Sequence, residues 1–187
     1  AVGTTAAING SLALTPGTTY YVTVRATNGV GLATGVTSDG VTVDVTAPTG
    51  GIVNDGTGPD VDLQAFTGTI SANWNGWADP TSGIAGYAWA IGTTPGGEDV
   101  QAFTGVGTAI TATRGSLSLT DGQTYYVSVR AANGAGLTAT ATSDGVTVDT
   151  TATVAGTVSD GSGADVDFQV SATTIAATWS GFSDPTS

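Results

Sequence analysis

The chain has 187 residues with 3 basic and 15 acidic side chains, a net charge of −12, and no Cys, Met or His. This charge excludes a phosphate-neutralising nucleic-acid surface, and the lack of Cys excludes disulfides and thiolate metal sites. Hydrophobic residues make up 40% of the chain and Gly numbers 29, which favours a packed all-β protein over a disordered one. No apolar run reaches about 18 residues, so no membrane span is expected.

In chain order, residues 1–11 predict a loop and the remnant of a strand, and Ser11–Leu14 predicts a short strand with two inward leucines. Residues 17–43 predict a β-hairpin, because apolar and polar residues alternate along its first half. Asp39 and Gly40 interrupt the second strand of this hairpin. The chain starts without Met or a charged-then-apolar leader, so we expect a fragment or a processed product.

The middle of the chain follows a linker at residues 48–51 and predicts strands separated by turns rich in Gly, Pro and Asp. These strands are expected at residues 60–64, 70–74, 87–91 and 99–106. Period-two alternation places one set of apolar side chains of the first two strands toward the core. The expected inward residues are Val61, Leu63, Ile70, Ala72 and Trp74.

The hairpin pattern returns at residues 122–149, after a short strand at 116–119. Tyr125, Val127 and Val129 alternate with polar residues, which predicts a half-buried strand. Asn133-Gly134 follows directly and predicts a two-residue type I′ turn, because both central residues of that turn need positive φ. We expect seven short strands in residues 48–152, the pattern of a β-sandwich.

The sequence repeats with a period of 105 residues, as between Tyr20 and Tyr125 or Trp74 and Trp179. A unit of this size is typical of one β-sandwich domain. We therefore predict the C-terminal part of a repeat at residues 1–47, one complete repeat at 48–152 and the N-terminal part of the next at 153–187.

The motifs of this unit resemble the fibronectin type III family. They are an inward Trp, a Leu-x-Leu strand, a turn before a Tyr and an Asn-Gly-x-Gly turn, at Trp74, Leu117–Leu119, Asp121–Tyr125 and Asn133–Gly136. The strings at residues 79–84 and 91–97 are similar to tandem copies in very long bacterial surface proteins. The resemblance implies tandem immunoglobulin-like, fibronectin type III-like β-sandwiches in a spacer, stalk, adhesin or filament.

Acidic residues form a candidate calcium site. Calcium takes about six to eight oxygen ligands, often from carboxylates. The candidate ligands are Asp55, Asp60 and Asp62, repeated at Asp160, Asp165 and Asp167. Asp60 and Asp62 are expected on one face of a strand, with Asp44 as a further candidate. The alternative is that these aspartates protect a strand edge and keep the surface soluble. No other cofactor is expected.

Two further features have two interpretations each, and one further function is not expected. Asn9 begins an N-glycosylation sequon, although its repeat position is Arg114 and sequons also arise by chance. Trp77 and Phe182 share a repeat position, where an aromatic ring stacks on a sugar or, in the interpretation that we favour, fills the end of the sandwich or the junction with the next unit. Catalysis is not expected, because His, Cys and Lys are absent and the one glutamate, Glu98, lies in a Gly-rich turn.

The sequence thus predicts a structural repeat of an extracellular fibre, stalk or cell-surface filament. Its expected partners are other copies of itself, end to end. No nucleic-acid partner and no membrane span are expected in these residues. Two arrangements stay open: the partial repeats of neighbouring copies complete each other, as in strand donation, or the sequence is a window of a longer covalent chain. The alternative function is an adhesin-type module that binds surface glycans or a protein partner; an enzyme's accessory domain is a third hypothesis.

Overall fold

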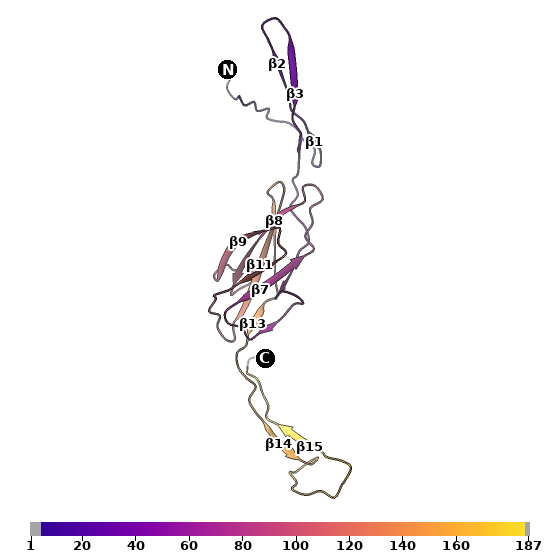
Figure 1. Cartoon of the computed structure of the whole chain (residues 1–187), viewed down its shortest axis with the longest axis vertical. Helices are drawn as coiled ribbons and strands as arrows, with labels where there is room; N and C mark the ends of the chain where they lie inside the picture. Colours follow the sequence, from indigo (N-terminus) through magenta and orange to yellow (C-terminus); the bar gives the residue numbers. More distant parts are fainter. Residues whose placement is uncertain (1–4, 186–187) are drawn as a thin grey trace.

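The chain is all-β. The computed structural model describes residues 5–185, and none of these residues is helical. Figure 1 shows a packed central body with one extended segment leaving it at the top and another at the bottom. The described chain is therefore elongated, with its packed part in the middle of the sequence.

The central body consists of strands β5 to β13 in two sheets. One sheet has the order β10-β7-β5, and the other has the order β6-β13-β11-β8-β9, with β12 also paired to β11. The pairing of β6 with β13 is parallel, and the others in the body are antiparallel. The strands are β5 Ile52–Asp55, β6 Leu63–Gln64, β7 Ile70–Asn75, β8 Ile84–Gly92, β9 Gln101–Gly107, β10 Thr111–Arg114, β11 Thr124–Asn133, β12 Thr138–Thr142 and β13 Val146–Val148.

Alternation along the strands produces the core between the sheets. Ile70, Ala72 and Trp74 of β7 are buried, as predicted. Val127 and Val129 of β11 are buried opposite them, in the same apolar cluster. Each large apolar side chain removed from water in this way contributes about 1.5–3 kcal/mol.

The predicted strand at 60–64 is wrong over most of its length. Residues 56–62 form a loop, and only Leu63 and Gln64 pair, in β6. Val61 is 39% exposed and Leu63 is 48% exposed, so neither points into the core. The physical reason is a local hydrogen bond: Oδ1 of Asp60 accepts the amide of Asp55 (2.7 Å), which closes a turn where alternation suggested extended chain.

The predicted type I′ turn at Asn133-Gly134 is also wrong. Among the residues of this turn the positive φ belongs to Gly136 (85°). The side-chain Oδ1 of Asn133 accepts the amides of Ala135 (3.1 Å) and Leu137 (2.8 Å), so the asparagine side chain shapes a longer turn. The body also has nine strands and not seven. β5 and β10 were not predicted, and Ser143–Gly145 divides the last strand into β12 and β13. The predicted strand at residues 116–119 is wrong, as is its counterpart at Ser11–Leu14, because neither segment forms a strand.

The two outer segments contain hairpins with the same pairing as the body. In the N-terminal segment β1 (Thr19–Tyr20) pairs β4 (Val41–Thr42), and β2 (Thr23–Thr27) pairs β3 (Ala33–Thr37). In the C-terminal segment β14 (Thr157–Asp160) pairs β15 (Ala177–Ser180). Thr19 faces Thr42 as Thr124 faces Thr147, so the strand register recurs 105 positions apart.

Candidate functional site

The candidate site is an acidic group at the end of β5. Asp55, Asp60 and Asp144 each offer one carboxylate oxygen, and these three oxygens lie within 4.8 Å of one another. Asp55 ends β5, Asp60 lies in the loop that follows, and Asp144 lies between β12 and β13. The group therefore connects the first strand of the central body to its last two.

Backbone hydrogen bonds fix this connection. The amide of Gly145 donates to Oδ2 of Asp55 (3.0 Å). Gly145 has a φ of 102°, and a Cβ atom there would lie 2.7 Å from the ring of Tyr126. A glycine is thus required for this amide to reach the carboxylate of Asp55 without strain.

Asp55 is the buried member of the group. Its side chain is 0% exposed, whereas Asp60 and Asp144 are exposed. Its Oδ1 accepts no hydrogen bond from residues 5–185. Burial is the main reason why the pKa of Asp55 is raised to about 6; the nearby Ser143 hydroxyl and the Gly145 amide lower this pKa, and the charges of Asp60 and Asp144 raise it.

This group differs from the calcium ligands predicted from the sequence. Asp55 and Asp60 lie together, Asp62 is not a member, and Asp144 takes the third place. Asp62 is outside because residues 56–62 form a loop, so it does not share a strand face with Asp60. A signal for Asp144 was present in the repeated Ser-Asp-Gly at 38–40 and 143–145, which interrupts a strand without ending the hairpin.

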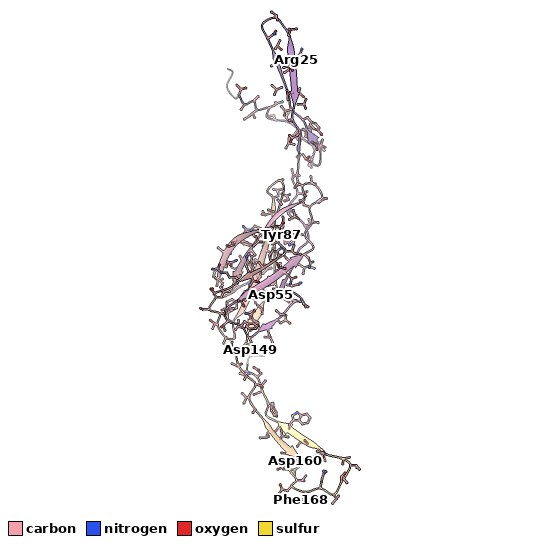
Figure 2. All side chains as sticks on the ribbon, viewed as in Figure 1. Arg25, Asp55, Tyr87, Asp149, Asp160 and Phe168 are labelled. Atoms are coloured by element: carbon pink, nitrogen blue, oxygen red, sulfur yellow. The ribbon has the colours of Figure 1, made fainter. Side chains whose placement is uncertain are left out.

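The repeat positions in the C-terminal segment do not form such a group. The amide of Asp160 donates to Oδ1 of Asp165 (2.8 Å), as in the central body. Among the described residues, however, Asp160, Asp165 and Asp167 do not bring three carboxylates together. The counterpart of Asp144 is Asp39, at the other end of the chain. Figure 2 shows Asp160 in the lower segment, well separated from the central body.

A second polar cluster joins the N-terminal segment to the body. Asn133 is 2% exposed, and its Nδ2 donates to Oδ2 of Asp44 (2.9 Å), to the carbonyl of Thr46 (2.8 Å) and to Oδ2 of Asp79 (2.9 Å). The Ser82 hydroxyl lowers the pKa of Asp44, and the Ser82 amide, followed by Asn133, lowers the pKa of Asp79. This joint holds residues of the segment against two loops of the body.

Both outer segments expose apolar side chains that the body buries at the same repeat positions. Val24 is 67% exposed and Val129 is 0% exposed, while Trp179 is 72% exposed and Trp74 is 1% exposed. The open side of the C-terminal segment contains a hollow of about 200 Å³ lined by Val166, Phe168 and Ile175, among others. In the body these faces are covered by the opposite sheet.

The remaining candidate residues lie outside any cleft-like site. Asn9 and Glu98 are exposed, and Oε2 of Glu98 accepts the amide of Phe103 (3.3 Å). Trp77 packs against the core and over Gly51, where a Cβ atom would lie 2.3 Å from its ring. Trp77 thus fills the end of the body, the interpretation favoured from the sequence.

The chain matches no protein-family model and no curated protein sequence. In the part of the chain that the structure describes, no helix is long and apolar enough to cross a membrane. The geometry of the acidic group, the joint and the exposed faces is therefore the basis for functional inference.

Proposed function

We propose that the chain is a structural part of an extracellular fibre, stalk or cell-surface filament. In this proposal tandem fibronectin type III-like β-sandwiches follow one another end to end and provide reach and cohesion. The observation that supports it best is that the strand pairing of the body recurs, in the same register, in the segments on either side. Figure 1 places these segments at opposite ends of the body, as a linear row requires.

Two details of the body support its assignment to this kind of sandwich. A three-stranded sheet faces a larger one, and the core lies between them. The hydroxyl of Tyr125 accepts the amide of Thr120 (2.9 Å), as expected for a tyrosine corner, and Tyr20 makes the same bond with Thr15 (2.9 Å).

The joint at Asn133 supports a row of units that keep a fixed angle. A flexible linker leaves its polar groups in water, whereas here residues 44–46 are held by a buried amide. The counterpart Asn28 forms the same turn with Val30 and Leu32 but lies in the open outer hairpin. We assign Asn133 the role of fixing the angle between one unit and the next.

The partners in this proposal are further copies of the same repeat. Exposed Val24 and Trp179 belong to faces that β5, β7 and β11 cover within the body, so another unit of the repeat has the matching surface. Such a unit belongs either to the same longer chain or to a neighbouring copy. No catalytic role is proposed. The proposal includes one cofactor, calcium, bound for stability.

The alternative is an adhesin-type module. Such a module needs an exposed aromatic platform or another surface that binds its ligand saturably. Trp77, the residue considered for sugar stacking, is instead packed over Gly51. The structural role is therefore the better supported of the two.

Small-angle X-ray scattering of chains with two, three and four complete copies of residues 48–152 tests this proposal. We expect the maximum dimension to grow by an equal step with each copy, because rigid joints keep the units in line. A dimension that stops growing would contradict the fibre role. Saturable binding on a glycan array, lost with Trp77→Ala, would favour the adhesin.

A further inference from the structure

We infer that Asp55, Asp60 and Asp144 bind one divalent cation of the calcium class. The ion connects the end of β5 to the turn between β12 and β13. The inference deepens the calcium part of the proposed function, but it does not depend on an end-to-end row. A body without the ion can still form a fibre, and an isolated body can still bind the ion.

Asp55 is a buried carboxylate without a cationic partner among the described residues. Asp55 is 0% exposed, and the charges that act on it come from two more aspartates. Burying an ionised carboxylate is costly unless it is paired and hydrogen-bonded. The Gly145 amide satisfies Oδ2. The Ser143 hydroxyl lies near Asp55, but Oδ1 accepts no hydrogen bond among residues 5–185. A cation bound to Oδ1 supplies the missing partner and the positive charge.

The spacing of the oxygens agrees with one shared ion. Calcium binds oxygens at about 2.3–2.6 Å, so two ligands of one ion lie at most about 5 Å apart. The three carboxylate oxygens lie within 4.8 Å of one another. Oδ1 of Asp60 accepts the Asp55 amide, which leaves its second oxygen for the ion.

The ligand set favours calcium over other biological cations. It contains carboxylates and no nitrogen or sulfur donor, which disfavours zinc and copper. Asp60 and Asp144 are exposed, so water reaches the ion and completes its shell. An open site of this kind binds calcium with a dissociation constant on the order of 10⁻⁴ M, the range of extracellular modules.

The place of the group in the topology indicates what the ion does. Asp55 and Asp144 are far apart in sequence: Asp55 ends a strand of the three-stranded sheet, and Asp144 lies between two strands of the other sheet. An ion between them binds the folded body and not the unfolded chain, so stability rises with the logarithm of the calcium concentration once this exceeds the dissociation constant. It holds the first strand of the body against the last hairpin.

Isothermal titration of the 187-residue chain with CaCl₂ tests the inference, with thermal unfolding as a second readout. We expect one site, a rise of several degrees in Tm with millimolar calcium, and affinity at least about tenfold weaker in Asp144→Asn. Asp144 is exposed, so this variant leaves the core intact. Two matched controls, Asp39→Asn at the same repeat position and Asp62→Asn in the same loop, should bind calcium like the parent.

Three results would overturn the inference. The first is no calcium binding at millimolar concentration. The second is binding that Asp144→Asn and Asp55→Asn leave unchanged. The third is tighter binding of magnesium than of calcium. In the first case no cation reaches Asp55, and its carboxyl resonance in NMR would titrate identically with and without CaCl₂. None of these results would alter the scattering of tandem copies.

Discussion

At the scale of single residues, Asp55 determines how the body responds to pH. Its folded-state pKa of about 6 exceeds the ordinary value of 3.8, so the folded protein holds a proton that the unfolded chain releases between these values. The resulting stabilisation is complete below pH 3.8 and is lost as the pH rises through 6. Calcium and the proton compete for the same carboxylate, so calcium binding should strengthen over this interval.

The first prediction concerns the calcium-free protein. With a chelator present, the free energy of unfolding should fall from pH 5 to pH 7, as measured by urea denaturation, and Asp55→Asn should remove most of this dependence. The lowered pKa values of Asp44, Asp79, Asp99 and Asp121 act in the opposite sense and below pH 3.8, outside this window. Stability that increases from pH 5 to pH 7 in the calcium-free parent would contradict the assignment.

The acidic group also shows how far the sequence alone identifies the residues of a candidate site. Asp55 and Asp60 were predictable because both lie in one short acidic stretch. For Asp144 the sequence offers only the repeated Ser-Asp-Gly, because its closeness to Asp55 depends on how the first and last strands of the unit pack. Asp62 was wrongly included because strand alternation was extended into a loop that the Asp60 side chain closes.

At the scale of elements, the same strand sequence exists in two environments. β7 is covered by the opposite sheet, and β15, at the same repeat positions, is open. Local alternation predicted β7, β8, β9 and β11, and with β11 the hairpin. It missed β5 and β10, and it wrongly predicted strands at residues 11–14 and 116–119. The shape of the turn at Asn133 was not predictable from the sequence. It comes from side-chain hydrogen bonds, which a rule based on the Asn-Gly dipeptide does not include.

The second prediction compares two isoleucines at one repeat position. Ile70 is 0% exposed and Ile175 is 88% exposed. Ile70→Ala should lower the free energy of unfolding by about 2–5 kcal/mol, because it removes core contacts and leaves a cavity. Ile175→Ala in the 187-residue chain should change it by less than about 0.5 kcal/mol. Equal effects of the two variants in urea denaturation would show that β15 is covered in solution.

The third prediction concerns the glycine that brings β13 to β5. Gly145→Ala should cost on the order of 1–3 kcal/mol, because φ is positive and the new methyl group meets Tyr126. Gly122→Ala is the control: φ is also positive there (74°), but the space around it is open. A Gly145→Ala variant no less stable than Gly122→Ala in thermal unfolding would argue against close packing at this turn.

At the scale of the whole molecule, the main feature is the joint between one unit and the next. The joint depends on a buried amide that faces Asp44 and Asp79. The repeat itself was predictable from the sequence, because a period of 105 residues is visible without structure. The joint was not predictable from the sequence, because Asn133 and Asp44 meet only after the body has folded and the linker has turned toward it.

The fourth prediction tests the joint with Asn133→Asp. This change keeps the oxygen that shapes the turn but places a third carboxylate beside Asp44 and Asp79, where like charges repel. Small-angle X-ray scattering of two joined complete repeats should then show a wider range of interdomain angles than the parent. The control is Asn133→Asp in the first of the two copies alone; because no unit precedes that copy, this variant should behave like the parent. Identical scattering of Asn133→Asp and the parent would contradict a fixed joint.

The fifth prediction is that residues 48–152 fold alone. All members of the main apolar cluster lie between Val53 and Val148, so this segment contains its own core. We expect one cooperative transition in chemical denaturation. A segment that folds only with its neighbours attached would contradict a row of independent sandwiches.

The most direct test of the end-to-end account is cryo-electron microscopy of the native assembly. The account predicts a linear row of sandwiches in which Val24 and Trp179 are as buried as Val129 and Trp74 are in the body, covered by strands of another copy of the repeat. Separate compact particles, or a row in which these two side chains remain open to solvent, would contradict it.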